Sequence, residues 1–188
     1  MKALRARHDA RDVRKNFDEC NGTLTTSRKV LDLMRDLYGA DNASALIEQS
    51  NLGSKQFGCG RHEKGIANVR AAADGLRDQF GEENRAVHQI SFYLAKYLHQ
   101  TGEHDESLAM LDHLEEIALD KTEGLAITAA EILLWRGRVL AELGWTNEAR
   151  ATLKRAARLA EAKNVSEEIA AEIDAEFEGL ALTVEPDV

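Results

Sequence analysis

Residues 143–149 read Leu-Gly-Trp-Thr-Asn-Glu-Ala, and the glycine of this segment, Gly144, recurs at intervals of 42 residues as Gly102 and Gly60. A glycine that returns at a fixed period of about 20–50 residues marks the same turn in successive units of a repeat protein. Such units stack on one another because no single unit can bury its own apolar face. The sequence therefore predicts an all-α chain in which these glycines join the two helices of successive pairs.

The columns around these glycines agree as well. Small residues stand seven positions before and five positions after each glycine: Gly53, Ala95, Gly137, Gly65, Ser107 and Ala149. Apolar residues stand nine and twelve positions after each glycine: Val69, Leu111, Leu153, Ala72, Leu114 and Ala156. These apolar residues are three positions apart and so form a stripe along one face of the second helix of each unit. Small residues on both helices predict that the two backbones approach closely as an antiparallel pair.

The segment 143–149 and the pair Leu94-Ala95 resemble the tetratricopeptide repeat (TPR) family. The resemblance covers about residues 41–163, and the 42-residue unit is similar to the longer-helix subclass found in kinesin light chains and in many bacterial signalling proteins. It implies a right-handed α-solenoid of antiparallel helix pairs. The sequence departs from the family at Arg136, where the family prefers an apolar residue, and in lacking the proline that ends a repeat.

Four parts are expected along the chain. They are an N-terminal helix or linker over 1–20, a repeat domain of about three to four helix pairs over 21–163, an acidic capping helix over 164–179 and a tail over 180–188. Residues 20–22 are expected to break the chain before a helix over 23–38. The helix pairs are expected at 42–58 with 62–80, 83–100 with 105–119, and 123–143 with 146–162. Ser166 suits the start of the last helix because its hydroxyl can accept a hydrogen bond from an orphan amide.

The net charge of −9 is concentrated at one end, since residues 165–188 carry eight acidic and no basic residues. The repeats are close to neutral, which disfavours nucleic-acid binding because phosphates need a clustered basic surface. No run of about 20 apolar residues and no signal-peptide pattern is present, so we expect a soluble protein without a membrane role. Cys20 and Cys59 are expected to be separate, unreactive thiols, which favours the cytoplasm and leaves the periplasm open.

The sequence contains no pattern that indicates catalysis, a metal site or a cofactor. Six histidines are present, but no His-Glu-x-x-His pair or comparable ligand spacing occurs. His62, His104 and His113 fall at turns or on helix surfaces, where a solvated imidazole is expected. We therefore expect a protein that binds a partner and is not an enzyme, with no catalytic residue, metal ligand or cofactor.

The resemblance implies that the first helices of successive units line a concave groove. Carried over by register, the groove residues are Ile47, Asn51, Ser54, Phe57, Gln89, Phe92, Lys96, His99, Leu134 and Arg138. Lys96 and Arg138 occupy equivalent positions one repeat apart, which favours a protein or peptide partner that is acidic and partly apolar. The alternative left open is that both are ordinary surface cations paired with neighbours such as Glu131 and Glu142.

These expectations describe a non-enzymatic scaffold that binds a peptide or protein partner. By resemblance, it is expected to be the regulatory domain of a bacterial signalling or transcription-regulatory protein. Two alternatives remain open: a sensor whose small-molecule or signalling-peptide site is walled by Phe92, Tyr93 and Trp135, and a module that self-associates into a homo-oligomer. The acidic segment that begins at Ser166 is also a candidate internal ligand for Lys96 and Arg138, although capping of the array explains the same residues.

Overall fold

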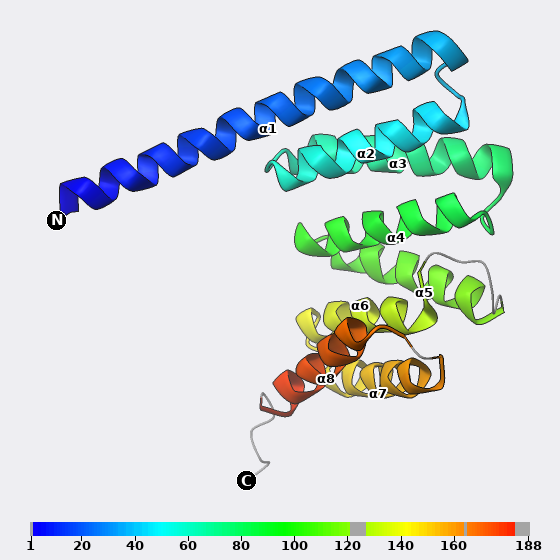
Figure 1. Cartoon of the computed structure of the whole chain (residues 1–188). Coiled ribbons are helices and arrows are strands. Elements are labelled where there is room, and N and C mark those ends of the chain that lie inside the picture. Colours follow the sequence, from blue (N-terminus) through cyan, green and yellow to red (C-terminus); the bar gives the residue numbers. More distant parts are fainter. Residues whose placement is uncertain (1, 121–126, 164, 183–188) are drawn as a thin grey trace. The chain divides into compact units, whose positions relative to one another are not determined.

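The computed structural model describes the backbone of residues 2–120, 127–163 and 165–182, and the side chains of residues 18–119, 127–162 and 165–180. Every regular element in those ranges is an α-helix (Figure 1). The helices are α1 (Lys2–Tyr38), α2 (Ala43–Gly58), α3 (His62–Phe80), α4 (Arg85–Gln100), α5 (His104–Asp120), α6 (Ala129–Glu142), α7 (Thr146–Lys163) and α8 (Glu167–Leu182). The all-α class predicted from the repeat is confirmed.

The turns that join paired helices have the predicted chemistry. Gly60, Gly102 and Gly144 adopt φ values of 75°, 87° and 78°. Glycine reaches this left-handed region without the steric cost that a Cβ imposes. In each turn the amide after the glycine donates to the carbonyl five residues earlier, as when Trp145 N–H donates to Leu140 O at 2.9 Å. This pattern satisfies carbonyls that the helix end would otherwise leave unpaired.

The helices fall into two compact units, Met1–Gln79 and Phe80–Val188. In the first, α1 packs against α2 through a small cluster of Leu24, Leu31 and Leu52. Figure 1 shows the amino-terminal part of α1 running on past the end of α2. α1 is one unbroken helix, so the break expected at residues 20–22 was wrong. Gly22 sits inside a helix that continues on both sides, and a single interior glycine weakens a helix without ending it.

A disulfide joins Cys20 on α1 to Cys59 at the end of α2. The expectation of two separate thiols was therefore wrong, and the argument for a reducing compartment that rested on it no longer holds. The pairing follows from the helix hairpin, because Cys20 lies 19 residues before the turn at residues 39–42 and Cys59 lies 17 residues after it, and antiparallel helices bring such positions together. The sequence concealed this pairing because the expected break placed Cys20 outside the helix.

The close approach predicted from the small residues is present in the first unit. A Cβ added at Gly53 would lie 2.7 Å from the backbone oxygen of Gly65, and a Cβ at Gly65 would lie 2.7 Å from the oxygen of Gly53. Real Cβ atoms do not approach backbone so closely. In α2 and α3, therefore, the two backbones touch where any side chain would hold them apart.

The second unit contains two helix pairs, α4 with α5 and α6 with α7, and α8 packs on α7 and α6. The buried Ser107 hydroxyl donates to the carbonyl of Ala95 at 2.8 Å, so the small column here also joins the paired helices. Leu134, Leu153 and Ile173 belong to one apolar cluster that connects α6, α7 and α8. Arg136, the departure from the family pattern, donates from Nη1 to the hydroxyl of Thr152 at 2.9 Å.

Helix boundaries differ from expectation mainly at loops. α6 begins at Ala129 because Thr128 and Glu131 form a reciprocal capping box, whereas the expected start at residue 123 lies outside the described residues. The hydroxyl of Ser166 accepts from the amide of Ile169 at 3.4 Å, as expected for a cap. α8 extends to Leu182 and takes in part of the expected tail, and residues 183–188 lie outside the description. Among the described residues, no helix combines the length and apolar character needed to cross a membrane.

Candidate binding site on helices α4 and α6

Two cations and an indole form the most distinctive arrangement of the second unit. Lys96 Nζ on α4 lies 4.3 Å from the ring centroid of Trp135 on α6, and the guanidinium carbon of Arg138 lies 4.6 Å from the same centroid. All three side chains are half-buried. A cation within about 6 Å of an aromatic face is attracted by the ring quadrupole. We call Lys96, Trp135 and Arg138 the Trp135 cluster.

More aromatic and imidazole groups surround this cluster. Lys96 Nζ is 5.6 Å from the ring of Phe92 and 5.8 Å from that of Tyr93. His99 meets Trp135 edge-on, with ring centroids 5.9 Å apart. Its Nδ1 lies 3.3 Å from Nδ1 of His104, so this pair shares a hydrogen bond that requires at least one neutral ring. The site is therefore a patch of two cationic side chains, Lys96 and Arg138, that lie against aromatic rings.

Burial lowers the pKa values of two groups at the site, Lys96 and His99. Burial is the main cause that lowers the pKa of Lys96; Arg138 acts in the same direction, whereas Glu172 and Glu131 oppose it. The pKa of His99 is lowered first by burial and then by His104. Within the described chain, no carboxylate comes within 4 Å of Lys96 Nζ. Among the residues that the structure describes, Lys96 thus has no direct ion-pair partner, although it has lost part of its hydration.

Arg138, in contrast, holds two carboxylates of α8. Its Nε donates to Glu176 at 2.6 Å, and its Nη2 donates to Glu172 at 2.9 Å. These glutamates are four residues apart and so lie on one face of α8. The alternative that Arg138 is a cation paired with carboxylates of the same chain is confirmed, although its described partners are Glu172 and Glu176. Glu131, one of the two carboxylates that were expected as partners, is engaged in the capping box of α6.

The structure brings Lys96, His99 and Arg138 of the expected groove set together around Trp135, and the Phe92 ring lies 5.6 Å from Lys96 Nζ. Phe92 and Leu134 are 3% and 0% exposed and belong to apolar clusters, so neither is the exposed groove residue that was expected. Apolar residues at helical spacing do not by themselves show whether a neighbouring helix covers them. Gln89 is half-buried on α4, without a described contact to the cluster.

The four α2 residues of the expected set belong to the first unit. Ile47 and Asn51 are exposed, and the Asn51 amide donates to Glu48 at 3.1 Å. Ser54 is half-buried. Phe57 is 8% exposed and stacks on His62 with centroids 4.5 Å apart, so it is a core residue rather than an exposed contact.

Four residues of the site were not in the expected groove set: Trp135, His104, Glu172 and Glu176. Trp135 was an expected wall of the alternative small-molecule site, and the two glutamates belong to the acidic segment that was a candidate internal ligand. Trp135 occupies the same repeat position as Asn51, so its register pointed to the groove. His104 is half-buried and contacts His99, which differs from the solvated imidazole expected there. The acidic excess after residue 165 was the signal for the two glutamates, but the sequence did not show which face of the last helix they occupy.

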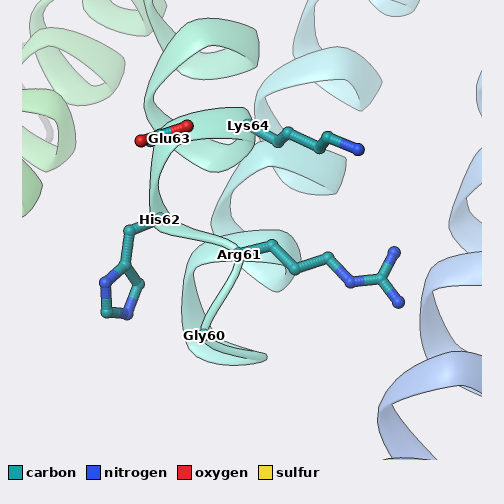
Figure 2. A pocket seen from close by; sticks show the side chains of 5 residues that line it. All are labelled: Gly60, Arg61, His62, Glu63 and Lys64. Atoms are coloured by element: carbon teal, nitrogen blue, oxygen red, sulfur yellow. The ribbon is translucent and has the colours of Figure 1, made fainter.

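A surface hollow at the start of α3 offers no comparable arrangement. It is lined by five consecutive residues, 60–64. Figure 2 shows Arg61 and His62 pointing in different directions. Arg61 already donates to the side-chain oxygen of Asn21 at 2.9 Å. Among the described residues, no three His, Cys, Asp or Glu side chains gather closely enough to hold a metal ion.

One buried histidine lies apart from the cluster. His88 on α4 is fully buried, and neither of its ring nitrogens has a hydrogen-bond partner in the described part of the chain. Burial lowers its pKa, and the Leu114 backbone offsets only part of this shift. His88 is therefore held as the neutral imidazole.

No family model matches the sequence, and no curated protein matches it significantly. Solved structures do resemble it. A putative kinesin light chain with nearly identical TPR-like repeats from Podosopora anserina aligns with a TM-score of 0.73 and 15% identity, over 96% of this chain and 86% of that one. A single-residue variant of that protein gives 0.74 and 15%, over 96% and 85%.

BtubC (BKLC) from P. vanneervenii is also similar, with a TM-score of 0.72 and 16% identity over 80% of this chain and 60% of that one. Identities this low establish the fold alone. The chain has the TPR-like helical-repeat fold that segment 143–149 predicted, and its structural neighbours include the kinesin light chain class to which the 42-residue unit is similar.

Proposed function

We propose that this chain is a non-enzymatic interaction scaffold and that its second unit binds an acidic, partly apolar protein or peptide segment at the Trp135 cluster. TPR-like repeats are in general scaffolds for protein partners, which supports the first part. One observation carries the second part. Lys96 and Arg138 lie on the first helices of successive pairs, α4 and α6, and their charged groups are 4.3 and 4.6 Å from the Trp135 ring centroid.

The physical argument rests on incomplete solvation. Lys96 is half-buried against aromatic rings and has no direct carboxylate partner in the described chain. A carboxylate from a partner would gain a charge-assisted hydrogen bond where water has already been partly removed. Tyr93 and Trp135, both half-buried, supply apolar area beside it. Charge would set the orientation of the partner, and the aromatic contacts would provide much of the affinity.

The length of the repeat unit supports a more specific proposal about the kind of protein to which this chain belongs. We propose a regulatory domain of a bacterial signalling or transcription-regulatory protein, because the 42-residue unit is similar to that subclass. A small-molecule pocket is less well supported, since Phe92, one of its expected walls, is buried in the core. Self-association is separable from both by light scattering at two concentrations, where an unchanged mass would argue against it.

Peptide selection on the full chain tests the proposal. Random peptides displayed on phage are selected against the wild-type chain, and the recovered peptides are then titrated against Lys96→Gln. We expect the peptides to be rich in Asp and Glu and to lose about tenfold or more in affinity, since one charge-assisted contact contributes about 1.5–3 kcal/mol. Lys154→Gln is the matched control, because Lys154 is an exposed lysine on α7 away from the cluster. Peptides without acidic bias, or equal losses in both variants, would refute the assignment.

A further inference from the structure

The carboxylates of α8 already occupy one half of the cationic patch. Glu172 and Glu176 reach Arg138, whose side chain is only 19% exposed, from a helix that follows the last repeat. The next residue along, Ile173, is 1% exposed and packs in the cluster that contains Leu134. One side of α8 thus combines an apolar anchor with two acidic groups, the combination that the proposed function assigns to a partner.

We propose that α8 is an intramolecular ligand of the Trp135 cluster, and that the partner which displaces it carries an acidic helix with two carboxylates four residues apart. This inference rests on the proposed function and specifies the partner's chemistry. The rotation of α8 about its axis supports it. Asp174 and Glu178 have the same spacing as Glu172 and Glu176, yet both are exposed, and Glu168, four residues before Glu172, is exposed as well. The helix therefore directs one particular acidic pair at Arg138.

Capping alone does not require this arrangement. A cap needs an apolar stripe, which Ile169, Ile173 and Leu180 supply through their contacts with the α6–α7 cluster. Burying part of an arginine adds a desolvation cost that an apolar residue would avoid, and only good hydrogen-bond geometry offsets that cost. Arg138 obtains this geometry from both α8 glutamates, at 2.9 and 2.6 Å.

The contact is also incomplete, which leaves room for a competitor. Glu172 acts on Lys96 through its charge but lies beyond ion-pair distance. A partner that placed one more carboxylate on Lys96 Nζ would make a contact that α8 lacks. Because α8 is tethered to α7, it competes at an effective concentration of about millimolar. A free partner must therefore bind the patch more tightly than α8 does, and the additional contact to Lys96 would contribute to that difference in affinity.

The test uses the full chain and a fluorescent synthetic peptide with the sequence of residues 166–182. Its binding is measured by polarisation to the wild-type chain, to Glu172→Gln/Glu176→Gln, and to the matched control Asp174→Asn/Glu178→Gln. We expect the first variant to bind the peptide at least about tenfold more tightly than wild type, because its own α8 competes less well. The control changes the same charge on the exposed face and is expected to bind like wild type.

The cluster itself can be followed in the same samples. In a Trp145→Phe background Trp135 is the only tryptophan, so its emission should respond to the peptide. Adding Arg138→Gln to the first variant should remove most of the gain, because Arg138 is the residue that the α8 glutamates contact. A peptide carrying Gln at both positions 172 and 176 should bind every chain at least about tenfold more weakly than the native peptide, a comparison that needs no destabilising change in the protein.

Equal peptide affinity for the wild type and both variants would overturn the inference, as would equal binding of native and Gln-containing peptides. The proposed function can survive that result. If phage-selected acidic peptides still require Lys96 while their affinity does not change in Glu172→Gln/Glu176→Gln, then the patch binds a partner and α8 is only a cap. If they do not require Lys96, the proposed function fails first.

Discussion

The two ends of the repeat array fasten their outermost helices in different ways. α1, in the first unit, is held on α2 by a small leucine cluster and the Cys20–Cys59 disulfide. α8, in the second unit, is held by Ile173 in an apolar cluster and by two ion pairs to Arg138. A covalent bond fixes one terminal helix, whereas reversible contacts hold the other. A helix that must leave its site needs the second kind of attachment.

Breaking the covalent attachment should have the largest effect. Cys20→Ser is expected to lower the free energy of unfolding of the first unit by about 3–4 kcal/mol, since the bond closes a loop with a sequence separation of 39. The second unit should keep its stability. Hydrogen exchange resolved along the chain measures both units at once. Matching protection of α1 and α2 in wild type and variant would show that the leucine cluster suffices.

The second comparison concerns how the paired helices approach. Gly65→Ala should cost about 3 kcal/mol, because its Cβ would lie 2.7 Å from backbone that cannot move aside. Gly137→Ala, in the second unit, should cost less, about 1–2 kcal/mol, because its Cβ meets the side chain of buried Leu153 instead of backbone. Urea unfolding gives both values. Equal costs would mean that the backbone contact in α2 and α3 is looser than described.

The third prediction is a pH dependence confined to the second unit. The pKa values of His88 and His99 are both lowered in the folded state. Near and below pH 6.5, the ordinary histidine pKa, the unfolded chain therefore binds more protons than the folded chain. The free energy of unfolding of this unit should therefore decrease as the pH drops from 7.5 toward 5.5. The decrease should be smaller than the one expected for the first unit on loss of the disulfide. Thermal melts monitored by tryptophan emission measure the trend, because Trp135 and Trp145 both lie in the second unit.

His88→Leu provides the control for that trend. It removes the fully buried imidazole and should reduce the pH dependence to the contribution of His99, whose pKa depends on burial and on His104, Glu142, Arg138 and Glu176. An unchanged slope would assign the effect to the His99–His104 pair instead of to His88.

The smallest expected effect returns to α1. Gly22→Ala should stabilise the first unit by about 0.5–1 kcal/mol, because alanine loses less backbone entropy in a helix interior. A Cβ at this position meets no neighbour within 4 Å, so no clash opposes the gain. A rise in the urea midpoint of the first unit checks it. A fall would indicate that the helix bends at Gly22.

These regions also show what the sequence could and could not predict. The turns at Gly60, Gly102 and Gly144 were predictable because only the local backbone decides them. The disulfide was not, because its geometry depends on whether α1 continues through Gly22, a balance of about 1 kcal/mol. Such a balance is settled by the tertiary packing of α1 on α2, which no local pattern records.

The candidate site divides in the same way. Repeat register placed Lys96 and Arg138 at equivalent positions, and the structure brings both to Trp135. The burial of Phe92 and Leu134 and the pairing of Arg138 with Glu172 and Glu176 followed from helices docking on one another. Arg136 shows the same dependence, since its partners, Asp112 and Thr152, lie on α5 and α7.

The position of the disulfide has one more consequence, for proteolysis. Cys20 and Cys59 lie at the ends of a hairpin whose turn contains the exposed residues 39–42. A protease that cut this turn would separate the chain into two pieces that stay joined as a single molecule. The nicked protein would run at full mass on a gel without reductant and release its amino-terminal fragment only when a thiol is added.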